Sequence, residues 1–546
     1  MDQIKISPDD FILGLTSPLT INQHDGCAAI MLNGKTLSCC EEERYIRNKH
    51  ALGKLPINAI SAALKINNLK MKDIKAVFVS AASFPDLKKR VQLYLNHYFG
   101  HSPELYMIDH QLSHLASAYY PSGFDESMVL SIDGYGDYKS MASAIGKSGK
   151  IEILESKEVT QSLGVFYQVM TQFIGFSGIG DEYKLMGLSA YGKPGVDLSS
   201  IIKISENNYS INNDYLKRDV DLKNTYEPRY GPELIKLLGQ PRIKGEKLSD
   251  YHKDIAFAVQ ESFEKAVITT VKKMYQKTKL KNLCMAGGCA LNCVTNMKLL
   301  NLDFIDNLYV QPAATDQGLA LGAILYGSSE AGIKPKKIPN YYLGSEYSNE
   351  NIKSALELSG AKYFQLNNKD ISKLASESLK NGKIIALYQG RSEFGPRALG
   401  NRSILANAII PDIKDQINKR IKFREEFRPF APAVLAESAN KIFSINQPSP
   451  FMTITSNVKK EWRNKIPGIV HVDGTARIQT VDEEQNKIFY SILKEFEKKT
   501  GIPVLVNTSF NIKGEPIVET PLDAIRTFYS CGLDELYIGN FRITKQ

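Results

Sequence analysis

An apolar run that ends in an aspartate and a glycine-rich turn constrains the fold of this 546-residue chain most strongly. The run VLSIDGYGD carries Asp133 out of an apolar segment into a turn that contains Gly134 and Gly136. Shortly before it, HQLSHLASAYY places His110 and His114 four residues apart, so on a helix they share one face. Two imidazoles and a carboxylate suit a divalent metal such as iron or manganese. Backbone N–H groups of a glycine turn after a strand can cradle phosphate, so the pattern predicts a nucleotide site with a metal.

Strand and helix patterns alternate along the chain, which is typical of an α/β fold. The segments HDGCAAIMLNGK and YKSMASAIGKSGK echo each other as hairpins that end in a Gly-Lys turn, the first turning at Asn33-Gly34. A duplicated hairpin is the plan of actin-like ATP-binding folds, although unrelated hairpins also look alike. We further expect helices at 57–66, 86–100 and 254–279, a helix capped by Thr520, and a strand RIQTV at 477–481.

The length predicts two or three domains, because one core does not grow to 546 residues. A Lys-, Pro- and Tyr-rich stretch around 333–352 marks the expected boundary, which divides the chain into 1–345 and 346–546. Residues 196–250 are polar and irregular, and we interpret them as an insertion or lid.

Composition excludes several classes of protein. The net charge of +9 is mild at this length, and no run of five basic residues is present, so nucleic acid is not an expected partner. We find neither a signal peptide nor an apolar run long enough for a membrane span, and therefore expect a cytoplasmic protein with no membrane contact. Seven dispersed cysteines argue against a disulfide framework. Cys284, Cys289 and Cys293 could form a metal cluster, but small buried hydrophobes are the favoured interpretation.

Further candidates for the metal and nucleotide site lie in polar loops of the first 345 residues. Asp316 in PAATDQG offers a second loop carboxylate for the metal. Lys184 could reach phosphate, and the turn AGGCALN supplies Gly287, Gly288 and Asn292. His97 and His101 repeat the four-residue spacing, but Gly100 and Pro103 break that helix, so we expect no site there.

The second part of the chain is rich in arginines interleaved with Gly, Phe, Pro and Ala rather than with other charges. This pattern favours a site for phosphate or carboxylate, which guanidinium groups bind with two hydrogen bonds. The candidates are Arg391, Arg397 and Arg402 in QGRSEFGPRALGNRS, Lys422, Arg424 and Arg428 in IKFREEFRPF, Arg477, Asn507 and Ser509. Near the N-terminus, His24-Asp25 is either a base beside a transferred group or a simple turn pair.

With these residues in place, the chain resembles the O-carbamoyltransferase family of nodulation-factor, cephem and tobramycin carbamoylation enzymes. The resemblance runs from about residue 13 to 540 and includes the long, distinctive stretch QGRSEFGPRALGNRS. The other matching stretches are HQLSHLASAYY, SIDGYGD, GDEYKLMGLSAYGKP, MAGGCALN, QPAATDQGLALGA, FREEFRPFAPAV, DGTARIQTV and VNTSFNIKGEPIV. It implies an actin-like carbamoyl-transfer domain at 1–345 fused to a YrdC-like domain at 346–546.

The resemblance also implies an activity and a role for each candidate residue. ATP and carbamoyl phosphate would give carbamoyl-adenylate in the YrdC-like domain, and the carbamoyl group would then pass to a hydroxyl of a small-molecule acceptor. Fe(II) or another divalent metal would be a cofactor, with magnesium as a further candidate. The implied metal ligands are His110, His114, Asp133 and Asp316. The implied catalytic residues are His24, Arg397, Lys422, Arg428, Arg477 and Ser509, and the cofactor-binding residues are Asp133, Gly134, Gly136, Lys184, Gly287, Gly288, Asn292 and Asn507.

Three alternatives stay open at this point. The same fold could serve a tRNA threonylcarbamoyl-adenosine modification enzyme, a nucleotide-binding regulatory protein without turnover, or an actin-like sugar kinase. The resemblance does not identify the acceptor, which could be a natural product or a sugar. The oligomeric state is also open, and a homodimer is one of the candidates.

Overall fold

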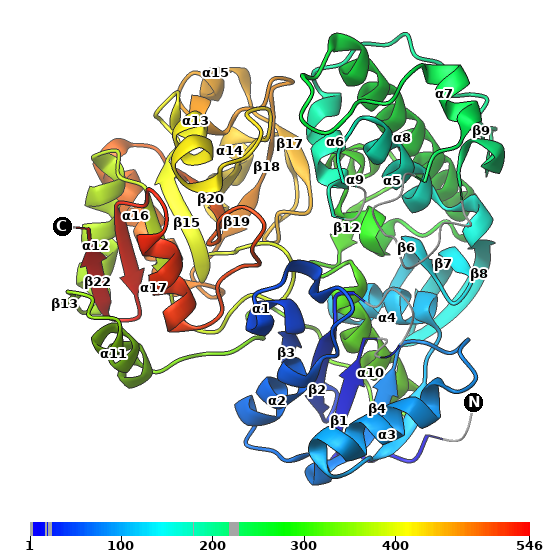
Figure 1. Ribbon diagram of the computed structural model, residues 1–546, viewed down its shortest axis with the longest axis horizontal. Coiled ribbons are helices and arrows are strands. Elements are labelled where there is room, and N and C mark those ends of the chain that lie inside the picture. The colour runs from blue at the N-terminus through cyan, green and yellow to red at the C-terminus, as the bar shows by residue number, and fades with distance from the viewer. Residues whose placement is uncertain (1–3, 17–18, 20–23, 178–179, 218–228, 546) are drawn as a thin grey trace. The chain divides into compact units, whose positions relative to one another are not determined.

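The computed structural model describes residues 4–16, 19, 24–177, 180–217 and 229–545. Contacts divide the chain into two compact units (Figure 1). Unit 1 holds the described residues of 1–23, 32–35 and 75–337, and unit 2 holds His24–Met31, Thr36–Ile74 and the described residues from Ile338 onward. The assignment of functional domains to 1–345 and 346–546 stays a prediction.

Unit 1 contains most of the first 330 residues. Its strands are β1 (Phe11–Leu15), β4 (Ile74–Val79), β5 (Glu104–Met107), β6 (Glu126–Gly136), β7 (Lys139–Lys147), β8 (Lys150–Glu158), β9 (Ile202–Ile204), β10 (Tyr209–Ile211), β11 (Asn282–Ala286) and β12 (Asn307–Val310). Its helices are α3 (Leu87–Phe99), α4 (His110–Ser122), α5 (Leu163–Phe173), α6 (Glu182–Ser189), α7 (Pro232–Leu238), α8 (Asp250–Thr278), α9 (Cys293–Leu300) and α10 (Leu319–Glu330).

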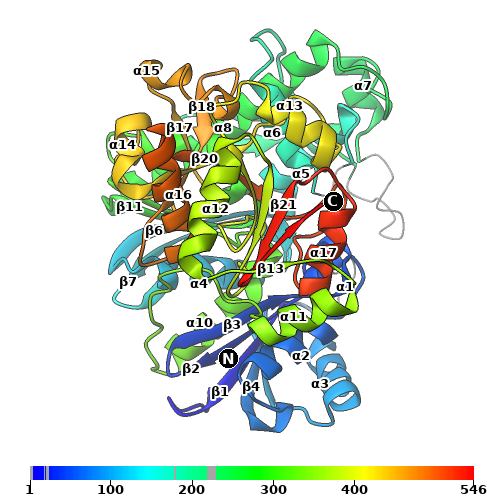
Figure 2. The ribbon, with the colours of Figure 1, turned by 90° about the vertical axis from the view of Figure 1, so that its left-hand side faces the viewer.

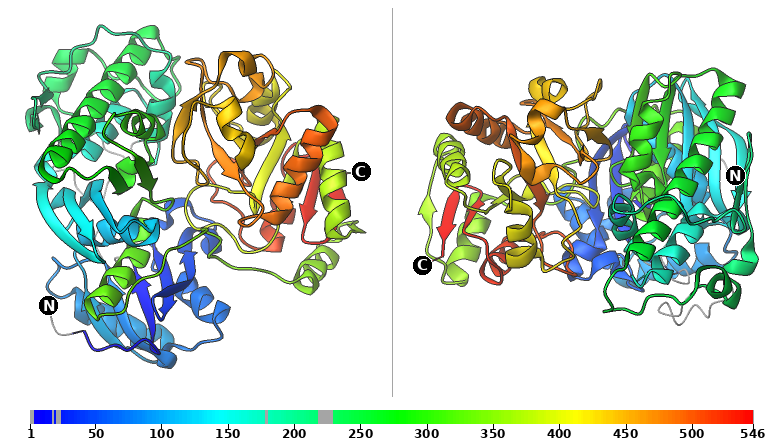
Figure 3. Two further views of the ribbon diagram at one scale, coloured as in Figure 1. Left: turned by 180° about the vertical axis from the view of Figure 1, so that it is seen from behind. Right: turned by 90° about the horizontal axis from the view of Figure 1, so that it is seen from above.

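The five-stranded sheet of unit 1 has the order β12-β11-β6-β7-β8. Strand β11 pairs in parallel with both β12 and β6, whereas β6, β7 and β8 are antiparallel and form the cyan arrows at the left of Figure 3. In the β6–β11 register, Ser131 lies opposite Ala286. The carboxyl ends of these two strands therefore lie at one edge of the sheet, where α/β proteins commonly bind ligands.

Helix α4 lies at the centre of unit 1. All thirteen of its residues are buried, although its sequence contains histidines, serines and a glutamine. It packs against α10 and against β6, β7 and β11. A helix buried on every side must satisfy its polar groups inside the protein, which makes them candidates for a site.

The two echoing hairpins close through the same kind of turn. Asn33 and Gly34 have φ values of 49° and 69°, and Ser148 and Gly149 have values of 50° and 76°. Two consecutive residues with positive φ between antiparallel strands are typical of a type I′ turn. The turn predicted at Asn33-Gly34 is confirmed, and the second hairpin shares its geometry.

Unit 2 contains two N-terminal segments and the C-terminal part of the chain. Its strands are β2 (Cys27–Leu32), β3 (Lys35–Glu41), β13 (Phe364–Gln365), β14 (Ile385–Tyr388), β15 (Arg402–Asn407), β16 (Ala431–Leu435), β17 (Thr455–Asn457), β18 (Thr475–Arg477), β19 (Gln479–Val481), β20 (Val504–Ser509), β21 (Glu535–Ile538) and β22 (Phe541–Thr544). Its helices are α1 (Glu42–Ile46), α2 (Ile57–Ile66), α11 (Asn349–Leu358), α12 (Asn368–Lys380), α13 (Ile413–Ile417), α14 (Ala439–Ile442), α15 (Lys460–Arg463), α16 (Lys487–Thr500) and α17 (Pro521–Tyr529).

An eight-stranded sheet organises unit 2, with the order β13-β22-β21-β14-β15-β20-β16-β19. Helices α12 and α16 pack together, and Figure 2 shows both over this sheet. Their apolar residues, among them Ile371 and Phe489, form a core with Leu387, Leu405 and Leu505 of the sheet. The mixed α/β class predicted from the sequence is confirmed.

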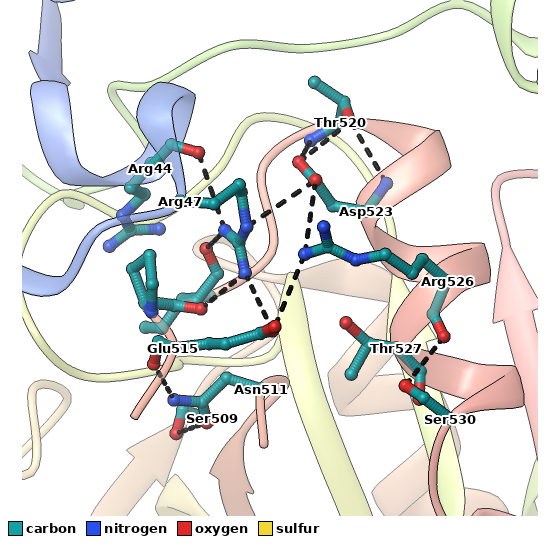
Figure 4. Close-up of polar contacts among 12 residues, drawn as sticks. Arg44, Arg47, Ser509, Asn511, Glu515, Thr520, Asp523, Arg526, Thr527 and Ser530 are labelled. Atoms are coloured by element: carbon teal, nitrogen blue, oxygen red, sulfur yellow. Dashed lines mark hydrogen bonds and ion pairs between the residues drawn. The ribbon is translucent and has the colours of Figure 1, made fainter. Parts of the chain in front are cut away.

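Several predicted element ends are confirmed and others are corrected. Thr520 caps α17 in a reciprocal capping box with Asp523 (Figure 4). Helix α8 begins four residues earlier than 254, because Ser249 caps it. The strand predicted at 477–481 is instead divided in two, since Arg477 ends β18, which pairs with β17, and Gln479 begins β19, which pairs with β16. None of the described helices combines the length and apolarity that a membrane span requires.

Candidate active site

Four side chains converge in unit 1 from distant parts of the chain. The Nε2 atom of His110 lies 3.2 Å from Asp133 Oδ2 and 3.7 Å from Asp316 Oδ1. The Nε2 atom of His114 lies 3.7 and 3.6 Å from the same two oxygens. The centroids of the two imidazole rings are 4.8 Å apart, and the angle between the ring planes is 76°. One ligand atom from each of these four residues thus faces a common point.

Local structure fixes each of the four residues. Asp109 caps α4 through Leu112 N, so His110 and His114 occupy successive turns on one face. Asp133 stands near the end of β6, where the pairing with β7 shifts register between Ile132 and Gly136. Asp316 begins a short 3₁₀ turn just before α10.

The geometry of this quartet suits a divalent cation. The ring nitrogens of His114 are buried and have no hydrogen-bond partner among the described residues, because the carboxylate oxygens lie beyond hydrogen-bond distance. Burial lowers the pKa of His114, but Asp133 and Asp316 outweigh it and raise that pKa to about 9. A positive charge is therefore favoured at the centre of the quartet, and nitrogen and oxygen donors of this kind bind first-row transition metals.

The glycine turns surround this quartet. The second oxygen of Asp133 accepts a hydrogen bond of 3.0 Å from Gly288 N, which joins the end of β6 to the turn after β11. Gly287 has a φ of 85°, and a Cβ there would overlap the carbonyl of Ile132. The predicted nucleotide-binding residues Gly134, Gly287 and Gly288 thus lie next to the quartet of His110, His114, Asp133 and Asp316.

Two further predicted cofactor-binding residues have local partners. Lys184 pairs with Asp181 at 2.9 Å and lies over the ring of Phe176. The side chain of Asn292 caps α9 through Thr295 N and exchanges hydrogen bonds with Gln260. Asn292 is buried, so it serves at least as an organiser of the turn.

In unit 2, the cluster around Lys422 consists of this buried lysine together with Arg424 and Arg428. Lys422 ends a π-helical turn at Asn418–Lys422, a rare geometry that is frequent at functional sites. Its ammonium donates to the Ser509 carbonyl and to Asn511 Oδ1, the latter at 2.7 Å. Burial first, and then the charges of Arg424 and Arg428, hold the pKa of Lys422 well below the usual range of lysine.

The other predicted residues of unit 2 occupy neighbouring strands and loops. Asn507 lies within β20 opposite Leu405 and Ala431, and its amide donates to Gln479 Oε1 at 2.7 Å. Ser509 ends the same strand, and Arg428 lies 3.5 Å from Glu425. Arg477 ends β18, and Arg397 is half-buried in the loop before β15. His24 lies in unit 2 as well, with Nδ1 3.3 Å from Asp25 Oδ2.

Two of the arginines expected at an anion site donate hydrogen bonds to backbone carbonyls instead. The buried guanidinium of Arg402 donates to the carbonyls of Gln389, Asn401, Ser345 and Gly390. Arg391 likewise donates to carbonyls of Gly344, Leu37 and Leu343. Both side chains hold loops of unit 2 together.

Comparison with known proteins identifies the family of this chain. The family model of the carbamoyltransferase N-terminus matches residues 78–325, and that of the carbamoyltransferase C-terminus matches residues 376–545. The nodulation protein NolNO of Sinorhizobium fredii is 35% identical over 96% of this chain and 79% of its own length. This chain belongs to the carbamoyltransferase family. The nodulation protein NolO of Bradyrhizobium diazoefficiens is 40% identical over 80% of this chain and 79% of its own. An uncharacterized protein of Synechocystis sp. is 34% identical over 96% of this chain and 95% of its own length.

The matched regions of this carbamoyltransferase contain nearly every candidate residue. The region matched by the N-terminal family model includes the quartet, Lys184 and the turn at Gly287. The C-terminal model includes the cluster around Lys422. His24 precedes both models. The protein is a carbamoyltransferase enzyme, as the resemblance predicted.

One residue that organises the quartet could not be predicted from the sequence, and that residue is Asp137. The carboxylate of Asp137 accepts hydrogen bonds from the backbone N–H groups of Ala82, Ser83 and His110, at 2.9, 3.0 and 2.9 Å. It thereby ties the turn after Asp133 to the first residue of α4. Asp137 was visible in the motif IDGYGD, but nothing in the motif showed which amides it would meet.

Replacing Gly136 by alanine is expected to weaken metal binding about 10–100-fold, the usual effect of disturbing the surroundings of a ligand. A Cβ at Gly136 would overlap the imidazole ring of His110. Gly134→Ala is the matched control, because a Cβ there meets no atom within 4 Å. Metal titration of both variants tests the prediction, and equal affinities would contradict it.

Proposed function

We propose that this carbamoyltransferase is an ATP-dependent O-carbamoyltransferase. It forms carbamoyl-adenylate from carbamoyl phosphate and ATP, and it transfers the carbamoyl group to a hydroxyl of a small-molecule natural product or sugar. The observation that carries the proposal is the cluster around Lys422, where a buried lysine lies in the field of Arg424 and Arg428. Lysine and arginine side chains gathered in this way favour anionic ligands, and both proposed substrates, ATP and carbamoyl phosphate, are anions.

The first half-reaction would use the residues of unit 2. Carbamoyl phosphate and water give carbamate and phosphate, and a carbamate oxygen then attacks the α-phosphorus of ATP with loss of pyrophosphate. Carbamate is a poor electrophile, and adenylation gives it a good leaving group. Lys422, Arg428, Arg397 and Arg477 would offset the charge on the phosphates, with Asn507 and Ser509 as polar contacts. This assignment corresponds to a YrdC-like domain at 346–546.

The second half-reaction would use the quartet of unit 1 in an actin-like domain. A divalent metal such as Fe(II), held by His110, His114, Asp133 and Asp316, would supply Lewis-acid stabilisation of negative charge. The turns at Gly134 and Gly287 would offer N–H groups to the adenylate phosphate. Separately, we propose His24, a residue of unit 2, as the base that accepts the proton of the acceptor hydroxyl.

Pyrophosphate release tests the proposal most directly. With ATP present and no acceptor, the protein is expected to release pyrophosphate only when carbamoyl phosphate is added. An enzyme heated to unfolding provides the blank. If the folded protein binds ATP but releases no pyrophosphate, the adenylation mechanism is wrong. Transfer of a threonylcarbamoyl group to tRNA, in place of carbamoylation of small hydroxyl acceptors, would instead favour the tRNA-modifying activity.

A further inference from the structure

A buried carboxylate lies between two histidines in unit 2. Asp25 Oδ2 is 3.3 Å from His24 Nδ1, and Asp25 Oδ1 is 3.0 Å from His50 Nδ1. Asp25 is only 5% exposed, whereas the side chains of His24 and His50 are 37% and 28% exposed. The carboxylate therefore presents one oxygen to each imidazole, and both imidazole side chains are partly exposed.

The backbone around this cluster is strained. Asp25, His50 and Ala51 all have positive φ values, of 51°, 64° and 46°. Asp25 N donates to the His50 carbonyl at 2.6 Å, and His50 N donates to Glu43 Oε2 at 2.7 Å. Residues other than glycine rarely adopt this conformation, and such strain gathers at functional sites. These bonds hold the three side chains in one arrangement.

The charges around Asp25 favour its ionised form. Burial raises the pKa of Asp25, but His50 and then His24 outweigh it and hold that pKa well below its usual value. Lys49 and Glu43 also face His50, whose pKa is raised chiefly by Asp25 against the lowering effect of burial. Burial raises the pKa of nearby Glu41 to about 8, although Arg44 opposes the shift. Asp25 is thus the fixed negative charge of the cluster.

Asp25, Glu43 and His50 could also be considered as metal ligands. Their hydrogen bonds argue against this use. Glu43 Oε2 already accepts from a backbone amide, and both Asp25 oxygens face an imidazole nitrogen. The arrangement is that of a carboxylate which orients imidazoles.

We infer that Asp25 is a positioning residue for His24, with His50 bracing the carboxylate from the other side. Asp25 holds the proton of neutral His24 on Nδ1, which leaves Nε2 as the atom that accepts the proton of the acceptor hydroxyl. As the acceptor oxygen bonds to the carbamoyl carbon, the bond from that carbon to the adenylate oxygen breaks and AMP leaves. His24 then releases the proton to solvent. This inference rests on the proposed transfer reaction.

The first test reads the His24 ring directly and needs no turnover. In full-length protein labelled with ¹⁵N-histidine, two-bond ¹H–¹⁵N correlation spectra identify the protonated ring nitrogen, and His24→Gln assigns the signal. Neutral wild-type His24 is expected to carry its proton on Nδ1. The Asp25→Asn variant is expected to lose that preference, because its amide can donate to Nδ1. A wild-type His24 protonated on Nε2 would overturn the inference, whether or not the variant folds.

The second test separates positioning from a structural role. Asp25→Asn is expected to lower kcat for carbamoyl transfer about 100-fold, within the contribution of a positioned general base, with KM for the acceptor unchanged. Asp86→Asn, a change at the exposed residue just before α3, is the control. Pyrophosphate release is followed in the same preparations. Its absence in wild type would refute the proposed function, whereas normal release with full transfer by Asp25→Asn would refute the inference alone.

Discussion

Replacing His110 by alanine is expected to slow carbamoyl transfer about 1,000-fold while pyrophosphate release continues at the wild-type rate. His110 belongs to the quartet of unit 1, and the cluster around Lys422 belongs to unit 2. Losing one of four ligands is expected to remove the metal, whose Lewis-acid contribution of several kcal/mol corresponds to a rate loss of about 1,000-fold. Metal analysis of the purified variant and product formation with a hydroxyl acceptor measure the two effects.

His97→Ala is the matched control for this experiment. His97 and His101 have the same spacing as His110 and His114, but His97 is exposed on α3 and no acidic group joins the pair in a metal-binding cluster among the described residues. The control is expected to keep its metal and its activity. Thermal unfolding of both variants separates loss of the metal from loss of the fold. A His110→Ala protein that transfers carbamoyl groups at the full rate would show that the quartet has no part in the reaction.

The members of the quartet could be predicted as candidate metal ligands from the sequence because most of them lie in strong local patterns. His110 and His114 share one helical face, and Asp133 lies near the end of the apolar strand β6. Chain order alone could not show that Asp316, which begins the turn before α10, would reach the same point. That meeting depends on α10 packing against the buried helix α4, a contact between segments about 200 residues apart.

The partners of the arginines in the arginine-rich motif could not be predicted from the sequence. Density of arginine among glycines predicted an anion site, yet Arg391 and Arg402 bind backbone carbonyls of unit 2. A guanidinium satisfies its five donors with carbonyls as well as with phosphate oxygens, and sequence spacing does not reveal which of these converge on it. The role of Asp25 between His24 and His50 was hidden for the same reason, because the two histidines are 26 residues apart.

Replacing Lys422 by methionine is expected to lower the rate of adenylate formation about 100–1,000-fold, the usual cost of removing one electrostatic contact to a transition state. Methionine keeps an unbranched side chain only one atom shorter and removes its charge. Lys419→Met is the matched control, because Lys419 lies exposed in the same π-helical turn. Carbamoyl phosphate-dependent pyrophosphate release measures the effect. An unchanged rate in a folded Lys422→Met protein would remove Lys422 from the site.

The lowered pKa of Lys422 adds a second, independent signature. Because burial and the neighbouring arginines favour the neutral amine, the free protein holds this proton less tightly than an ordinary lysine does. A bound polyphosphate would reverse the local potential and raise the pKa, so ATP binding is expected to take up protons at pH values above the pKa of the free protein and below that of the complex. Calorimetric titrations with ATP in buffers of different ionisation enthalpy, over a range of pH, measure that uptake. It is expected to disappear in Lys422→Met and to persist in Lys419→Met, since only the buried amine changes its protonation when the anion arrives.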